Sequence, residues 1–219
     1  MHRTLAVALV ALALTTTPAN AEADCPFVTD AVDDATSAPR DPGLDIVSAD
    51  VDGNGRDLTA IVRVASLVEP IVGDPVVTDP TGHVPPVAAP RGTVPDPKRG
   101  RRYAVSFDAN GTRLVLRLTV TEDGAESYET LVRTATEPTE TYATLGSAHG
   151  VYDAGARQVV IGVPLGLLAM EVGTPPNAVL SNVAVRTARF TGWDPDVTAD
   201  EASTTRTYAL DTPGCVDVG

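Results

Sequence analysis

The stretch from Tyr103 to Val120, YAVSFDANGTRLVLRLTV, constrains the fold of this chain more than any other. Its centre, Asn110-Gly111, predicts a β-hairpin, because a type I′ turn requires positive φ at both central residues. Folding there places apolar residues opposite one another at alternate positions: Tyr103 and Leu118, Val105 and Leu116, and Phe107 and Leu114. A slip of one residue would bring Arg113 or Arg117 into that face, so the pattern selects one register. One face of the hairpin is therefore expected to be buried and the other to meet water, as in an antiparallel sandwich.

The rest of the chain repeats this alternation between turn signals. Strands are expected over residues 44–51, 57–68, 127–136, 141–152, 157–163, 178–190 and 205–210, with a short start at Phe27-Val28. Residues 164–172 predict one short helix that ends at Gly173, and residues 192–202 read as an acidic loop. About nine strands with one helix predict an all-β protein, an antiparallel β-sandwich of jelly-roll or immunoglobulin-like type.

The first residues have the form of a secretory signal peptide. His2 and Arg3 precede an apolar run, and Ala19-Asn20-Ala21 suits cleavage after Ala21. The apolar run is too short to anchor the chain in a bilayer, and nothing later resembles a transmembrane segment. We therefore expect residues 1–21 to be removed and residues 22–219 to form a single secreted, extracellular domain without a membrane span.

Two cysteines, Cys25 and Cys215, lie near opposite ends of the exported chain. In an oxidising compartment such a pair predicts one disulfide bond, which would close almost the whole domain. Two free thiols, or pairing between molecules, is the alternative.

The chain is acidic, with 29 acidic and 16 basic residues and a net charge of −13, which becomes −14 when Arg3 leaves with the signal peptide. This charge disfavours nucleic acids and anionic lipid surfaces as partners. It is compatible with solubility outside the cell and with cation binding. We expect a monomer.

Residues 69–102 form a proline-rich stretch, and proline lacks the backbone donor that a central strand needs. A loop of this length is either functional or disordered. Its composition favours disorder. It ends in the basic cluster 98–102, which we interpret as a solvated edge.

The most suggestive string for a metal is DVDGNGRD, residues 50–57. Asp50, Asp52, Asn54 and Asp57 offer oxygen ligands around a tight turn, like the first half of a calcium loop. The twelfth position is Ile61, where such a loop needs a bidentate Glu, so a hairpin turn with solvated acids is the alternative. A calcium site outside the helical type could borrow ligands from Asp30, Asp33 or Asp34.

Trp193 is the single tryptophan, and with Asp194 and Asp196 it could form a ligand-binding platform in a loop. A partly buried anchor is the other interpretation of this tryptophan. No G-x-S-x-G elbow and no His/Cys spacing typical of zinc is present, so no catalytic residue is singled out. We expect a protein that is not an enzyme.

A family resemblance follows from the order of these segments: acidic residues 29–34, LDIVSADV, LTAIVRVASL, YAVSF, and VVIGVP followed by Leu165-Gly166. The order resembles the small secreted β-sandwich modules that occur alone or at the ends of exported bacterial hydrolases. It is similar in outline to DOMON and family 9 carbohydrate-binding domains. The resemblance covers most of residues 24–210 and implies ligand binding or an accessory role. The proline-rich insertion and the scarcity of aromatic residues depart from it.

The sequence is therefore compatible with three functions. The first is a non-catalytic extracellular module that binds an unidentified ligand or surface, with carbohydrate as one candidate and calcium as a possible cofactor. The second is a structural or protein-interaction domain of the cell envelope that uses the proline-rich loop. The third is an extracellular hydrolase without a recognised motif.

Overall fold

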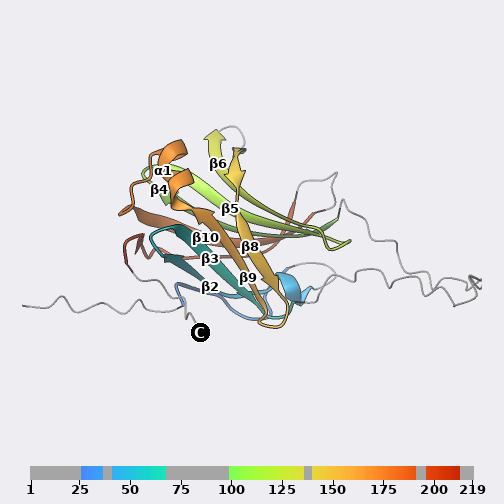
Figure 1. Cartoon of the computed structure of the whole chain (residues 1–219). Coiled ribbons are helices and arrows are strands. Elements are labelled where there is room, and N and C mark those ends of the chain that lie inside the picture. Colours follow the sequence, from blue (N-terminus) through green and yellow to red (C-terminus); the bar gives the residue numbers. More distant parts are fainter. Residues whose placement is uncertain (1–25, 37–40, 68–98, 136–139, 191–195, 213–219) are drawn as a thin grey trace, which may run out of the picture.

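The computed structural model describes residues 26–36, 41–67, 99–135, 140–190 and 196–212 (Figure 1). They form two facing antiparallel sheets and one short α-helix, which confirms the all-β sandwich predicted from the sequence. Cys25, Cys215, Trp193 and Asp194 lie outside the described residues, as do residues 1–25 with the expected signal peptide and residues 68–98 of the proline-rich stretch.

The smaller sheet has five strands, here in spatial order: β1 (Val28–Thr29), β2 (Ile46–Gly53), β3 (Asp57–Val64), β9 (Gln158–Pro164) and β8 (His149–Asp153). The larger sheet has seven strands: β11 (Val197–Ser203), β10 (Val179–Phe190), β4 (Gly100–Ala109), β5 (Thr112–Thr121), β6 (Glu126–Ala135) and β7 (Thr141–Ser147), with the short β12 (Tyr208–Ala209) also pairing with β10. A short 3-10 helix, η1 (Pro42–Leu44), precedes β2.

The hairpin of β4 and β5 lies in the middle of the larger sheet, between β10 and β6. Its register is the predicted one, with Phe107 opposite Leu114 and Tyr103 opposite Leu118. Asn110 and Gly111 both have positive φ, 49° and 77°, as a type I′ turn requires. The pattern of alternating residues was sufficient here because one face of the hairpin is fully buried.

The core fills the space between the two sheets. From β4 and β5 it takes alternate residues, and Tyr103, Phe107 and Leu116 are 0% exposed. The smaller sheet contributes Leu58 and Ile161 in the same way. Burying each large apolar side chain contributes about 2 kcal/mol to the free energy of folding. The remaining residues of β4 and β5 consequently point away from the core, to the outer face of the larger sheet.

The expected single strand over 141–152 is in fact two strands in different sheets. β7 ends at Ser147 in the larger sheet, and β8 begins at His149 in the smaller one. Ala148 is the crossing point, and its N–H donates to the carbonyl of Tyr128 at 3.2 Å. The pattern in this segment fits either sheet, so the sequence does not reveal the crossing. Ser147 and His149 therefore belong to different sheets.

The expected acidic loop over 192–202 was wrong in its second half. Residues 197–203 form the edge strand β11, whose Ala199 and Ala202 are buried, while the expected strand over 205–210 is reduced to β12. The acidic residues misled the prediction: Glu201 lies on the outer face of this edge strand, and Asp200 points inward, where it accepts from the backbone N–H of Ile46. The short strand β1, the division of the 141–152 segment and β11 together bring the count from about nine strands to twelve.

The predicted helix is present as α1 (Leu165–Val172) and ends at Gly173, which adopts the left-handed conformation with φ 68°. Such a C-cap is the usual place for glycine. None of the helical segments that the structure describes has the length and apolar character that crossing a bilayer requires.

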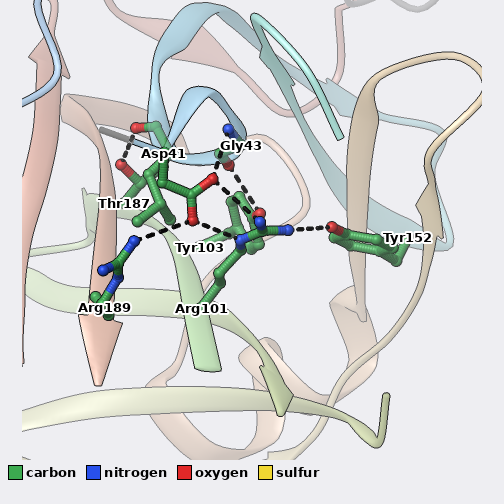
Figure 2. A network of polar contacts seen from close by, with 8 residues as sticks. Asp41, Gly43, Arg101, Tyr103, Tyr152, Thr187 and Arg189 are labelled. Atoms are coloured by element: carbon green, nitrogen blue, oxygen red, sulfur yellow. Dashed lines mark hydrogen bonds and ion pairs between the residues drawn. The ribbon is translucent and has the colours of Figure 1, made fainter. Parts of the chain in front are cut away.

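A network of polar side chains fixes η1 against both sheets (Figure 2). Arg101 of β4 donates to both carboxylate oxygens of Asp41, from Nε at 2.9 Å and from Nη2 at 3.1 Å. Figure 2 shows the Arg101 guanidinium between Asp41 and Tyr152 of β8, whose hydroxyl oxygen accepts from Nη1 at 3.2 Å. Arg189 of β10 approaches Asp41 at 3.5 Å.

The backbone of η1 is held by hydroxyl groups from the larger sheet. The Tyr103 hydroxyl donates to the carbonyl of Gly43 at 2.8 Å, and Thr187 Oγ1 donates to the carbonyl of Leu44. Burial raises the pKa of the Tyr103 phenol well above its ordinary value, which keeps it protonated as a donor. The network thus connects β4, β8 and β10 through one buried turn.

Candidate functional site: a polar groove on the larger sheet

A groove of about 540 Å³ runs over the outer face of the larger sheet. It crosses the sheet from β11 to β7, because its lining includes Glu201 of β11 and Tyr142 of β7. Adjacent strands lie about 4.8 Å apart, so six strands span roughly 24 Å. The side chains in it are those that alternate with the core residues of β4, β5, β6 and β10. A groove of this length suits an extended ligand better than a compact one.

Five arginines from four strands line the groove: Arg102, Arg113, Arg117, Arg133 and Arg186. Four of them form ion pairs that hold their guanidinium groups in place: Arg102 with Asp196, Arg113 with Asp108, Arg117 with Glu129, and Arg133 with Glu140. A guanidinium has five N–H donors, and these contacts use only some of them. The arginines are thus preoriented, with donors left for a ligand.

The charge of the groove differs from that of the whole chain. Five arginines and four carboxylates, those of Asp108, Glu140, Asp196 and Glu201, line it. With Glu129, which pairs with Arg117 beside the groove, the positive and negative charges balance, in a chain whose net charge is −13. The interspersed donors and acceptors suit a ligand that presents both, such as a polyhydroxylated one.

The floor of the groove is small and apolar. Ala104, Ala184 and Ala188 leave the backbone of β4 and β10 close to the surface, and Val115 and Leu131 add aliphatic contact area. At the rim, the Tyr142 ring is 37% exposed and its hydroxyl donates to Glu140 at 3.0 Å. Burial and the bond to Glu140 raise the pKa of Tyr142, so it stays a donor at neutral pH. Apolar contact area combined with placed polar groups is a feature of small-molecule sites.

Asp196 is the described member of the predicted set Trp193, Asp194 and Asp196. It lies in the groove directly before the start of β11, paired with Arg102. The Arg102 guanidinium also lies over the Phe190 ring, 4.5 Å from its centroid. The sequence therefore pointed to one residue of the groove. It missed the arginines, although Arg113 and Arg117 were already placed on the water-facing side of their hairpin.

The predicted calcium ligands are not brought together by the structure. The Asp50 carboxylate accepts from Phe27 N at 2.8 Å and pairs with Arg63, and it is only 2% exposed. Asp50 lies opposite Ile61 in the neighbouring strand. Because Ile61 is four residues beyond Asp57, Asp50 and Asp57 are separated by about 13 Å along the strand direction. The Asn54 side chain accepts from the backbone N–H groups of Arg56 and Asp57. Asp52 lies near the Tyr208 hydroxyl at 3.5 Å. This string forms a capped hairpin turn, the alternative that the sequence left open.

Three other acids lie close together where β1 and β11 approach one another. One carboxylate oxygen from each of Asp30, Asp34 and Asp200 lies within 4.8 Å of the others. Burial raises the pKa of Asp30, and the charges of Asp34 and Asp45 raise it further. Burial and the charges of Asp30 and Asp34 likewise raise the pKa of Asp200. Asp30 Oδ2 is buried and has no donor among the described residues. A proton shared with Asp200 would give this oxygen a partner and would reduce the repulsion between the two carboxylates.

Two of these three acids also organise backbone. Asp200 accepts from the N–H groups of Ile46 and Glu201, and Asp30 accepts from that of Ala31. Carboxylate oxygens are the ligands that calcium prefers, but a group of acids alone does not define a metal site. Calcium binding stays a prediction.

A scan against models of known protein families found no match, and searches of curated proteins and of solved structures at the same level of significance found none either. The resemblance to DOMON and family 9 carbohydrate-binding domains thus stays a prediction.

Proposed function

We propose that this protein is an exported, non-catalytic binding module whose groove on the larger sheet binds a polysaccharide. The observation that carries the proposal is the composition of that groove: preoriented arginines and carboxylates alternate over an apolar floor, across roughly 24 Å of sheet. Export itself rests on the signal-peptide pattern of the first 21 residues.

A sugar ring matches this surface in two ways. Its hydroxyl groups both donate and accept, so neighbouring hydroxyls can bond to a guanidinium and a carboxylate at once. Its C–H groups can pack on Val115 and Leu131, which lie in the floor of the groove and are 9% and 5% exposed. Affinity would come from many weak polar contacts, with Tyr142 as the described aromatic residue at the rim.

Three of the four acids that line the groove have surroundings that support binding rather than hydrolysis. A glycosidase needs a carboxyl with a raised pKa that can protonate the leaving group. Glu140 has the opposite property, because hydrogen bonds from Tyr142 and Arg133 lower its pKa. Asp108 and Asp196 are paired with arginines.

The test is a panel of soluble polysaccharides: β-glucan, mannan, xylan, glucuronoxylan, hyaluronan and polygalacturonate. Retardation in affinity gels is measured first, and titration calorimetry then gives Kd, with calcium or a chelator added in parallel. Arg113→Gln and Tyr142→Ala are expected to weaken binding at least tenfold. Arg56→Gln, the same type of change at an exposed turn outside the groove, should leave Kd unchanged.

If none of these polymers binds the wild-type chain, the proposal is wrong. It is equally wrong if binding is found but the groove variants retain it. Sensitivity to the chelator would support a calcium requirement, and the Asp30→Asn variant would then show whether the acid group of Asp30, Asp34 and Asp200 is responsible.

A further inference from the structure

We propose that the polysaccharide carries spaced carboxylate groups, and that Arg186 and Arg117 bind one such carboxylate above Ala104. This inference rests on the proposed function, because it names the class of glycan that the same groove selects.

The register of the strands places these three residues in one row. Ala104 of β4 pairs with Arg186 of β10 on one side and with Arg117 of β5 on the other. The two arginines are therefore two strand spacings apart, about 9.6 Å between their backbones. Between them the side chain is a single methyl group. The row thus leaves an open slot between the two arginines, whose guanidinium groups bond to Thr198 of β11 and Glu129 of β6 on its outer sides.

Arg186 is also surrounded by small residues along its own strand. Ala184 and Ala188 precede and follow it on the outer face of β10, and both line the groove. With Ala104, three alanines border this arginine. A ligand group can therefore reach the guanidinium without displacing a larger side chain.

Arg186 differs from the other four arginines of the groove in the group that its guanidinium contacts. Each of those pairs with a carboxylate, whereas Arg186 donates to the hydroxyl of Thr198. Glu201 is its cross-strand partner on β11 and lines the groove, but the described residues show no ion pair between them. Arg186 is thus the groove arginine whose guanidinium is held by a hydroxyl group rather than by a carboxylate.

A carboxylate is the anion that this arrangement fits. The planar fork of arginine matches a carboxylate with two parallel hydrogen bonds. Arg117 donates to Glu129 from Nε and Nη2, at 3.1 and 2.7 Å, which leaves its Nη1 donors for the ligand. One arginine without a carboxylate partner, in a chain of net charge −13, suits one isolated acid group rather than a polyanion. The ligand class is a mainly neutral glycan with spaced uronic acids.

The experiment compares glucuronoxylan before and after reduction of its carboxyl groups to alcohols, by calorimetry with the full mature chain. Reduction keeps the backbone and removes the charge. For the wild type we expect the native polymer to bind tenfold or more tightly than its reduced form. That preference should decrease as salt is added.

Variants locate the preference. Arg186→Gln should abolish the difference between native and reduced polymer, and Arg186→Lys, which keeps the charge without the fork, should retain part of it. Ala104→Val fills the slot with a residue that favours strands, so it should remove the preference without unfolding the sheet. Thermal melting of each variant confirms that the fold is intact. Arg133→Gln, at the far side of the groove, should weaken both forms of the polymer by the same factor.

Equal binding of native and reduced polymers overturns this inference and leaves the proposed function standing. Binding of neutral polymers alone has the same meaning, and so does a preference that survives in both Arg186→Gln and Ala104→Val. Tight binding of polygalacturonate with none of glucuronoxylan would also overturn it, because a polyanion would then be the ligand. Failure of every polymer to bind removes both proposals.

Discussion

Arg101 and Arg102 are neighbours on β4, and they show how differently the two sides of one strand are used. Arg101 points between the sheets, where Asp41, Tyr152 and the turn of η1 surround it, and 26% of its side chain is exposed. Arg102 points outward into the groove, where it pairs with Asp196 and is 28% exposed. Their exposed fractions are nearly equal, so burial alone does not distinguish their roles.

The difference lies in what each arginine holds together. The pair Arg101–Asp41 connects η1 to β4, and the same carboxylate also accepts from Gly43 N and lies near Arg189. The pair Arg102–Asp196 connects the start of β4 to the start of β11 and lies open to a ligand. The inner network therefore stabilises the fold, whereas the outer pairs orient donors. We expected the basic cluster 98–102 to be a solvated edge. Instead it supplies Arg101 to the inner network and Arg102 to the groove.

The largest expected effect comes from the matched substitutions Arg101→Met and Arg102→Met. Methionine keeps most of the apolar stem, so each change mainly removes the guanidinium. We expect Arg101→Met to reduce the free energy of unfolding by about 3 kcal/mol, because Asp41 is left partly buried without its main partner. Arg102→Met should cost about 1 kcal/mol or less. Urea unfolding measures both, and equal losses would break the distinction between the two sides of β4.

A second comparison uses two tyrosine hydroxyls. Tyr103→Phe removes the bond to the carbonyl of Gly43, and this buried acceptor then lacks its donor. We expect a loss of about 1 kcal/mol in the free energy of unfolding. Tyr142→Phe removes a hydroxyl that bonds to Glu140 at the exposed rim of the groove, so it should change the free energy of unfolding by only a few tenths of a kcal/mol. A larger loss in Tyr142→Phe than in Tyr103→Phe would contradict the assignment of roles.

A third prediction concerns two aspartates in opposite surroundings. Asp41 lies among cations and N–H donors, whereas Asp30 lies among carboxylates and its pKa is raised, first by burial. The folded state therefore keeps the Asp30 proton to a higher pH than the unfolded state does, where the ordinary value is 3.8. The stability associated with this proton is complete below that pH and is lost as the pH rises through the raised pKa.

Asp30→Asn removes the charge and keeps the shape, so we expect a modestly higher Tm than wild type at pH 7. The advantage should disappear below about pH 3.8, where wild-type Asp30 is protonated in both states. Thermal melts at pH 3 and pH 7 provide the measurement, with Glu171→Gln on α1 as an exposed control. A lower Tm at pH 7 would mean that the Asp30 charge has a favourable partner, such as a bound cation.

These regions also show how much of the structure could be predicted from the sequence. The β4–β5 register was fully predictable, since any slip buries Arg113 or Arg117. Contacts distant in sequence were not: nothing in residues 178–190 says that β10 lies beside β4, and that pairing puts Arg186 next to Ala104. The calcium expectation was limited in the same way. Asp30 and Asp34 were named as possible ligands, but their neighbour Asp200 comes from a strand taken for a loop.

The smallest expected change in stability comes from Arg133→Gln, and it isolates the role of the outer pairs. Arg133 and Glu140 are 29% and 53% exposed, and exposed pairs contribute about 0.5 kcal/mol or less. Hydrogen bonds from Tyr142 and Arg133 lower the pKa of Glu140 below its ordinary 4.5, so the pair persists into mildly acidic solution. We expect Arg133→Gln to melt within a degree or two of wild type and to bind the polysaccharide several-fold more weakly. The reverse result, a large fall in Tm with unchanged binding, would assign the groove arginines to the fold, as Arg101 is.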